Sequence, residues 1–256
     1  MGTLLEGLLF VGAAVLFAIV GVLAGRGIVH RQIAEGHNDV LVPIFLTAGV
    51  VYAVLLGFMV VGEWESYDNA HANVAEEAAL LVPLYRQSEV LPQDQGAKIR
   101  VLLHKYAEDV VAGWDRFAGG IRNTDAGADM QNLFTAFGGI VPTTKVQELT
   151  AGQFMTSLNL MLLDRNKRYM QSAESLSWIM WLAAVGGGMV TVALTFLLYM
   201  ERTWPHVAAV SVMAAMIALL LFTIAVLNRP FLGPLAIESS PFEASLVVFD
   251  QVDHGQ

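Results

Sequence analysis

The chain has 256 residues, of which 55% are hydrophobic and only 14% are charged. Soluble domains carry about 25% charged residues, so the composition indicates a membrane protein and argues against an ordinary soluble enzyme. The formal net charge of −9 argues against a nucleic-acid-binding protein, because phosphates require a basic surface. The sequence has no cysteine, which excludes disulfides, thiolate metal sites and a catalytic thiol.

Four apolar stretches are long enough to cross a membrane, since a spanning helix needs about 20 mostly apolar residues. They cover residues 7–25, 40–62, 178–200 and 206–227. The first is interpreted as a retained anchor, because no basic residue precedes it as in a signal peptide. The sequence thus divides into spans one and two (1–62), a middle domain (63–176), spans three and four (177–228) and a C-terminal turn with a short helix (229–256).

Four spans place both termini and the middle domain on the same side of the membrane. Tryptophans favour the headgroup region, and Trp64, Trp178 and Trp204 lie at predicted span ends. Positive charges near the membrane ends give only a small bias between the two sides. The short loops contain Arg26, Arg31 and Arg202, and the other side contains Arg165, Lys167, Arg168 and Arg229. We expect an inner (cell) membrane location with the termini and the middle domain in the cytoplasm.

The middle domain has a helical pattern and no period-two strand. Apolar residues recur at spacings of three and four: Ile99, Leu102, Leu103, Tyr106, Val110 and Trp114. A further helix is predicted after Pro142, where Thr144 and Gln147 can form a capping box. We expect span two to continue into this domain as one helix, and the segment from Thr144 to Met200 to run into span three.

After span four, Pro230 is expected to end the helix. Ser240, Pro241 and Glu243 then predict the start of a short helix through Phe249, since Ser caps a helix, Pro suits its first turn and Glu completes a capping box. The predicted fold class is therefore all-α, a four-helix transmembrane bundle with a helical domain between spans two and three.

Span two carries the first group of candidate functional residues. Small residues at every fourth position let helices approach closely in lipid. Aromatic side chains on the same span are usually core or lipid-facing, although rings of them form hydrophobic constrictions. The pore-lining candidates are Phe45, Gly49, Tyr52, Ala53, Gly57 and Phe58. The small residues indicate either packing within one chain or a subunit contact or pore-facing stripe.

An acidic segment follows span two. Its candidates for a pore mouth or an ion-binding site are Glu63, Glu65, Asp68, Glu76 and Glu77. Carboxylates suit a divalent ion or a cation-attracting ring, and a solvated helix start is the alternative. Arg165, Lys167 and Arg168 precede span three and are interpreted as an anchor to anionic lipid or as partners of the acidic segment.

Several of these residues resemble the bestrophin-like membrane family. The resemblance lies in the second span and its exit helix, in a basic pair before span three and in a turn after span four. Its residues are Phe45, Tyr52, Gly57, Phe58, Trp64, Tyr67, Ala70, Glu76-Glu77-Ala78, Arg165-x-x-Arg168, Arg229-Pro230-Phe231-Leu232-Gly233 and Pro241-Phe242. The chain departs from the family at Ser175-Leu176-Ser177, where a proline is frequent.

The resemblance implies four membrane helices, a cytoplasmic helical domain and distant kinship with bestrophins, which are pentameric ion channels whose central pore is lined by the second span. The first hypothesis is therefore a homo-oligomeric channel of unknown selectivity, a pentamer by resemblance only, with the lipid bilayer and inorganic ions as partners. The alternative is a non-conducting scaffold or sensor whose helical domain binds a partner. We expect no enzymatic activity and no cofactor, because catalytic motifs and ionisable residues well inside the spans are missing from the sequence.

Overall fold

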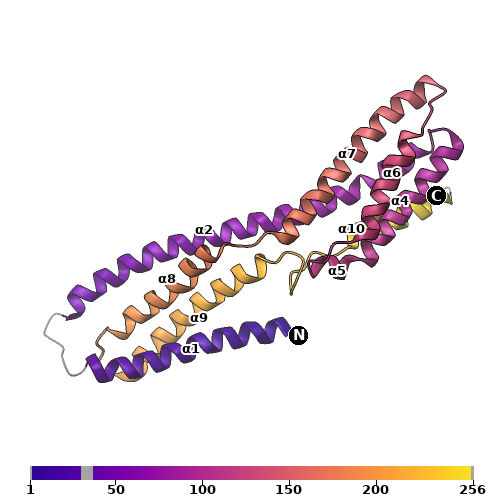
Figure 1. Ribbon diagram of the computed structural model, residues 1–256. Coiled ribbons are helices and arrows are strands. Elements are labelled where there is room, and N and C mark those ends of the chain that lie inside the picture. The colour runs from indigo at the N-terminus through magenta and orange to yellow at the C-terminus, as the bar shows by residue number, and fades with distance from the viewer. Residues whose placement is uncertain (1, 30–36, 255–256) are drawn as a thin grey trace. The chain divides into compact units, whose positions relative to one another are not determined.

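The computed structural model describes residues 2–29 and 37–254, and these residues form helices, turns and short connections without a strand. The helices shown in Figure 1 are α1 (Gly2–Val29), α2 (His37–Ala79), α3 (Leu81–Ser88), α4 (Gln93–Ala112), α5 (Trp114–Ala118), α6 (Thr124–Gly138), α7 (Lys145–Ala173), α8 (Trp178–Phe196), α9 (Thr203–Leu227) and α10 (Ser240–Asp253). The all-α prediction is confirmed.

The chain divides into two compact units, each built from segments that are separated in the sequence. The membrane unit comprises Met1–Ser66 and Ser175–Arg229, and the helical domain comprises Tyr67–Glu174 and Pro230–Gln256. Helix α2 contributes its first part to the membrane unit and its residues from Tyr67 onward to the helical domain. The prediction that span two continues as one helix is confirmed, because α2 has 43 residues, about twice the ~20 that a crossing needs.

The membrane unit contains four helices that are long and apolar enough to span a bilayer. The candidate spans are Leu5–Gly27, His37–Ser88, Trp178–Phe196 and Thr203–Leu227. Within this unit α9 packs against α1 and α8 (Figure 1). Close approach is possible because α1 presents Gly21 to the ring of Phe196, where any larger side chain would collide.

Polar groups in the membrane unit gather at the helix ends. The Arg26 guanidinium donates to the carbonyl oxygens of Met200 (2.7 Å) and Glu201 (2.9 Å) and contacts the Thr203 hydroxyl. The Asn38 side chain pairs with the backbone of Tyr199. These bonds satisfy the turn between α8 and α9, and α8 accordingly ends at Phe196 rather than at the predicted Met200. Arg31, also counted in the short loops, lies outside the described residues.

The prediction of one helix from Thr144 to Met200 is wrong. Helix α7 ends at Ala173, and α8 begins at Trp178 after extended backbone at Glu174 and Ser177. The Ser177 hydroxyl accepts from the backbone N–H of Met180, and the Asn228 side chain accepts from the Leu176 N–H. A serine cap and an asparagine from α9 therefore stabilise a break that contains neither glycine nor proline.

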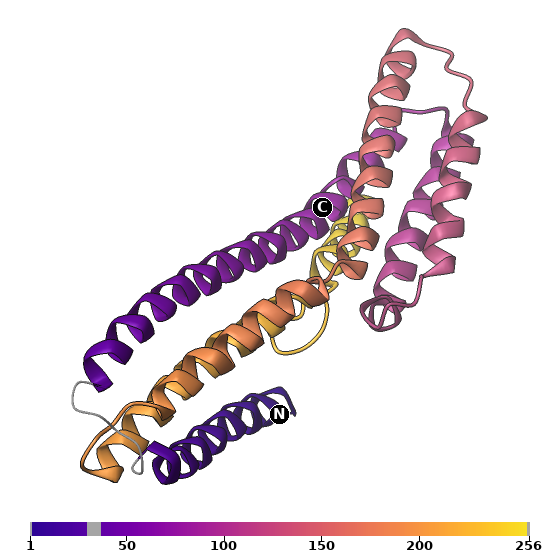
Figure 2. The ribbon, with the colours of Figure 1, turned by 60° about the vertical axis from the view of Figure 1, so that its left-hand side comes forward.

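The helical domain packs α3 to α7 and α10 around an aromatic core. The predicted apolar face of α4 is confirmed, with Ile99, Leu103, Tyr106 and Val110 buried. Helices α4 and α6 lie side by side, as the two views show (Figures 1 and 2). Helix α7 begins after Thr144, whose hydroxyl accepts from the Gln147 N–H as predicted.

Helix α10 starts at Ser240 with Ser239 as its cap, one residue before the predicted cap. The Ser239 hydroxyl donates to the Glu243 carboxylate (2.7 Å), so Ser239, not the predicted Ser240, is the serine that meets this glutamate. Phe242 and Phe249 of this helix are fully buried, which places α10 within the core of the helical domain.

Candidate functional site

Helix α2 has a packed face in the membrane unit. Tyr52, Leu56 and Met59 are buried against α8 and α9 in a cluster with Ala184 and Leu221. The Tyr52 hydroxyl donates to the Ala184 carbonyl oxygen (2.7 Å). This bond satisfies the only polar atom of a side chain that is 7% exposed.

The glycines of α8 accommodate this tyrosine. A Cβ atom on Gly187 or Gly188 would lie 2.7 Å from an atom of the Tyr52 side chain, closer than van der Waals contact allows. Gly187 and Gly188 therefore permit the close packing of α2 against α8. The prediction that Tyr52 lines a pore is not supported, because its side chain is enclosed within one chain.

Other positions of α2 have no neighbouring element among the residues that the structure describes. A Cβ atom on Gly49 or Gly57 would meet no atom of another element within 4 Å. Ala53 is exposed, and Phe58 is 75% exposed. Of the predicted pore-lining residues, Ala53, Gly57 and Phe58 are thus exposed, and Phe45 and Gly49 are half-buried, although a Cβ atom on Gly49 would still meet no described neighbour. We call Gly49, Ala53, Gly57 and Phe58 the open face of α2.

The predicted acidic residues do not form one group. In the membrane unit, Glu65 is exposed and Glu63 is half-buried; in the helical domain, Asp68 and Glu76 are exposed. Among the residues that the structure describes, no three His, Asp or Glu side chains are placed to hold a metal ion. The divalent-ion interpretation of this segment therefore lacks a coordination site.

Glu77 is the exception, and its assignment as an ion-binding candidate needs correction. Its side chain is 0% exposed. Its Oε1 accepts from the Tyr106 hydroxyl (2.5 Å) and from Arg168 Nη2 (3.0 Å), and its Oε2 accepts from Arg168 Nε (2.7 Å). The carboxylate accepts three hydrogen bonds from a bidentate arginine and a phenol, and its complete burial gives an ion from solvent no access to it.

Aromatic rings enclose the Arg168 guanidinium. Its Cζ lies 4.7 Å from the ring centroid of Phe117, 5.4 Å from that of Trp114 and 5.7 Å from that of Phe242. Burial opposes the charged form, but attraction to Glu77 and the hydrogen bonds to it raise the pKa of Arg168 above its ordinary value. Burial and the negative charge of Glu77 raise the pKa of Tyr106 well above its ordinary range. At neutral pH Arg168 is therefore charged and Tyr106 is a hydrogen-bond donor.

The other basic residues before span three have different partners. Lys167 Nζ lies 2.8 Å from Asp164 Oδ1, and the Asp164 backbone carbonyl accepts from the side chain of Asn73 (2.8 Å). Arg165 stacks on the Tyr169 ring, with its Cζ 4.9 Å from the centroid. Arg168 thus pairs with Glu77, and Lys167 pairs with Asp164.

The turn after α9 is ordered by its proline and glycine. The Ile237 N–H donates to the Pro230 carbonyl oxygen (2.8 Å), and Gly233 has a φ of +91°, which favours glycine. The turn directs Phe231 into the core, where its ring lies 4.9 Å from that of Phe117. Trp64, the remaining motif residue, is 57% exposed in the membrane unit, which suits an indole at a headgroup region.

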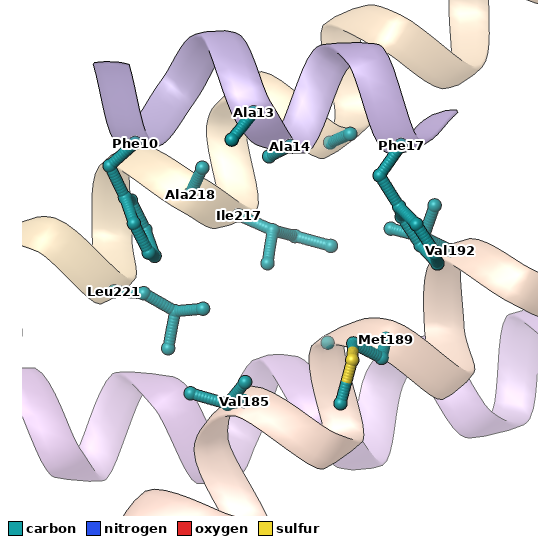
Figure 3. A pocket seen from close by; sticks show the side chains of 12 residues that line it. Phe10, Ala13, Ala14, Phe17, Val185, Met189, Val192, Ile217, Ala218 and Leu221 are labelled. Carbon is teal, nitrogen blue, oxygen red and sulfur yellow. The ribbon is translucent and has the colours of Figure 1, made fainter. Parts of the chain in front are cut away.

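An apolar cavity of about 180 Å³ lies between α1, α8 and α9. Figure 3 shows Phe10, Ala13, Ala14 and Phe17 of α1 on one side and Val185 and Met189 of α8 on the other. All of its lining side chains are apolar, so the cavity offers no group to replace the hydration shell of an ion.

Sequence reasoning missed Tyr106 as a partner of the acidic segment and the enclosure of Arg168. The helical periodicity of the sequence contains a signal for the burial of Glu77 and Arg168. Glu77 is in phase with the buried Val74 and Leu81, and Arg168 is in phase with Leu158 and Met161. A charged residue in phase with a helical apolar face is expected to be buried and paired.

These features define a four-span, all-helical membrane protein with a helical domain. A sequence profile of the bestrophin-like domain matches residues 12–242, so the chain belongs to the bestrophin-like family. The resemblance found in span two and the turn after span four is thereby confirmed.

The fold is similar to that of a bacterial bestrophin homologue from Klebsiella pneumoniae whose crystal structure carries one point mutation. The TM-score is 0.73 at 13% sequence identity, over 96% of this chain and 98% of that chain. At this identity the likeness shows a shared fold. The search of curated proteins gave no match.

Proposed function

We propose that the protein is a homo-oligomeric ion channel or pore whose path is lined by α2. The observation that carries the proposal is the open face of α2, where a Cβ atom on Gly49 or Gly57 would meet no other described residue. Membership of the bestrophin-like family supports the proposal. We leave the selectivity of the channel open, and a pentamer is proposed from the family resemblance only.

Gly49 and Gly57 lie on an open helix face, so a benefit of glycine at these positions has to come from contacts outside the chain. Glycine in a helix interior is less favourable than alanine by roughly 0.5–1 kcal/mol, and the open positions gain no intrachain packing in return. A second helix in close contact, or a narrow path along α2, would occupy the space that larger side chains at these positions would fill. Phe58 beside Gly57 supplies an apolar ring for a constriction in that path.

The other features of the membrane unit are consistent with a path along α2. The cavity between α1, α8 and α9 is lined by apolar side chains, which argues against an ion route inside one chain. Glu65 follows the open face on the same helix and is exposed. We propose that Glu65 attracts cations to the mouth, and that the helical domain (predicted as 63–176) and both termini are cytoplasmic in a cell (inner) membrane.

The test is ion flux through liposomes that contain the purified protein, with K⁺ and Cl⁻ gradients imposed in separate experiments. Phe58→Ala should increase the flux severalfold, because it removes the proposed constriction. Glu65→Gln should lower cation flux relative to anion flux. Met216→Ala, an exposed position on α9, is the matched control and should leave both fluxes unchanged.

Folded protein that conducts neither ion, or Phe58→Ala and Met216→Ala variants with equal flux, would contradict the proposal. A monomer in mild detergent would exclude a central path as well.

A non-conducting scaffold is the second candidate, and one observation favours it. Helix α7 exposes an apolar stripe on the helical domain, formed by Val146, Leu149, Leu160 and Leu163. Such stripes mark surfaces that bind protein. The scaffold hypothesis predicts that Leu149→Lys and Leu160→Lys abolish recovery of a partner from the cell while the protein alone shows no flux.

A further inference from the structure

The helical domain contains a basic pocket that the channel proposal does not use. The pocket has a volume of about 580 Å³ and lies between the α5–α6 connection and the last turns of α7. Arg122, Asn166 and Ser172 contribute polar side chains to its lining, and Phe117, Ile121 and Tyr169 contribute apolar ones. We propose that it binds the phosphate group of an anionic phospholipid. This inference is independent of ion conduction.

Three guanidinium groups surround the Tyr169 ring that lines the pocket. The Cζ atoms lie 5.5 Å (Arg122), 4.9 Å (Arg165) and 5.4 Å (Arg168) from the ring centroid. Glu77 neutralises Arg168, but no carboxylate among the described residues forms an ion pair with Arg122 or Arg165. Two uncompensated positive charges therefore share one ring in a chain whose net charge is −9.

Arg165 adds a second positive charge beside the pocket without lining it, since its guanidinium stacks on the Tyr169 ring and its Nε is buried. Arginine pairs strongly with phosphate oxygens. Arg122 is exposed and lines the pocket, so it is the group placed to contact the ligand, while Arg165 adds a positive charge beside it.

Hydrogen bonds fix the loop and the aromatic ring that line the pocket. Gly120 has a φ of +83°, and the Ile121 N–H donates to the Arg116 carbonyl oxygen (2.9 Å), which closes the turn that presents Arg122. The Tyr169 hydroxyl donates to the Asn123 carbonyl oxygen (3.3 Å). These bonds hold the loop and the ring that flank the pocket.

Apolar side chains at the rim favour a lipid over a free anion. Ile121 is 61% exposed and Met170 is 68% exposed, and both line the pocket beside Arg122. Basic side chains next to exposed apolar ones are typical of proteins that contact the headgroup region. In the chain, Ala173 of the pocket also precedes the candidate span Trp178–Phe196 by only a few residues.

The experiment is native mass spectrometry of the full chain in a non-ionic detergent. The probes are dihexanoyl-phosphatidylglycerol, dihexanoyl-phosphatidylcholine and inorganic phosphate. Phosphatidylglycerol should bind saturably and more tightly than phosphatidylcholine, whose choline cation is repelled by the two guanidiniums. Arg122→Gln should weaken phosphatidylglycerol binding by about tenfold, as expected for one lost charge-assisted hydrogen bond.

The matched control is Arg86→Gln, which removes the same charge from an exposed position on α3 and should change binding less than twofold. Arg122 is exposed, so its substitution is expected to leave the fold intact, and the far-UV circular dichroism of both variants checks this.

Displacement of phosphatidylglycerol by millimolar inorganic phosphate would support the phosphate-binding chemistry and show that the group is recognised without its acyl chains. Equal phosphatidylglycerol binding by Arg122→Gln and Arg86→Gln would overturn the proposal, as would equal binding of the two phospholipids to the unmodified chain.

Discussion

The membrane unit and the helical domain are stabilised by different kinds of buried contact. The membrane unit is held by small residues, such as Gly21 under the Phe196 ring and Gly187 under Tyr52, and a buried hydrogen bond joins Tyr52 of α2 to Ala184. The helical domain encloses an ion pair, Glu77–Arg168, among aromatic rings. Lipid is itself apolar, so helices in it associate through close packing, whereas a domain in water gains stability by excluding water from side chains.

The two units also differ in whether side chains discussed above have partners among the described residues. In the helical domain the polar atoms of Glu77, Arg168 and Trp114 have partners. In the membrane unit, a Cβ atom on Gly49 or Gly57 of α2 would meet no other described residue. A helix with an open face suits contact with other subunits or with a permeating ion.

The largest expected effect comes from breaking the buried ion pair. Glu77→Gln leaves the Arg168 charge uncompensated among aromatic rings and should lower the free energy of unfolding by about 3–5 kcal/mol. The measurement is urea unfolding of the full chain in mild detergent, followed by far-UV circular dichroism. The double variant Glu77→Gln/Arg168→Met removes both charges and should recover part of this loss. If Glu77→Gln alone were neutral, the pair would not be buried as described.

A second prediction applies one substitution to two glycines. Gly188→Val should clash with Tyr52 and Ile217, which lie 2.7 Å and 3.1 Å from the new Cβ, and should destabilise the membrane unit by about 1–3 kcal/mol. Gly57→Val meets nothing within the chain and should keep the same melting temperature. We expect Gly57→Val to reduce oligomerisation or flux instead, measured by light scattering and liposome flux. Equal destabilisation by both substitutions would mean that the α2 face is covered within one chain.

The third prediction concerns alkaline pH. The pKa of Tyr106 is raised in the folded chain by burial and by Glu77, against about 10 when unfolded. The stabilisation is therefore complete below about pH 10 and is lost as the pH rises towards the folded pKa. Tyr106→Phe should cost about 1.5–3 kcal/mol at pH 8, as expected for a hydrogen bond to a charged group, and should flatten the decrease in stability above pH 10. A steep decrease that survives in Tyr106→Phe would assign the effect to other groups, such as Tyr85, whose pKa is also raised by burial and Asp253.

The smallest effect is expected for Tyr52→Phe. The substitution removes the hydrogen bond to Ala184 but keeps the ring against Gly187 and Gly188. Hydrogen bonds between membrane helices contribute about 0.6 kcal/mol on average, so the melting temperature in detergent should fall only slightly. Tyr52→Ala, which also removes the ring, is the comparison and should be far more destabilising.

The spans, the continuity of α2 and the apolar face of α4 could be predicted because hydropathy and periodicity are local. The break between α7 and α8 could not, because it depends on Asn228, a distant residue that accepts from the Leu176 N–H. The acidic run containing Glu77 resembles a solvated helix start, and only its partner Arg168, 91 positions away, makes burial favourable. The division of α2 into a packed and an open face depends on Tyr52 meeting Gly187 and Gly188, which no local pattern specifies.

The discontinuous construction of the helical domain has a consequence for biosynthesis. Phe231, Phe242 and Phe249 complete its core, yet they follow α8 and α9 in the chain. Domains generally fold as units while the chain is made. The aromatic core of residues 67–174 therefore stays incomplete until α8, α9 and the residues that follow them have been synthesised. The final docking of α10 would then report that insertion is finished, and a chain stalled before it would expose Arg168 and its aromatic rings to proteases and chaperones.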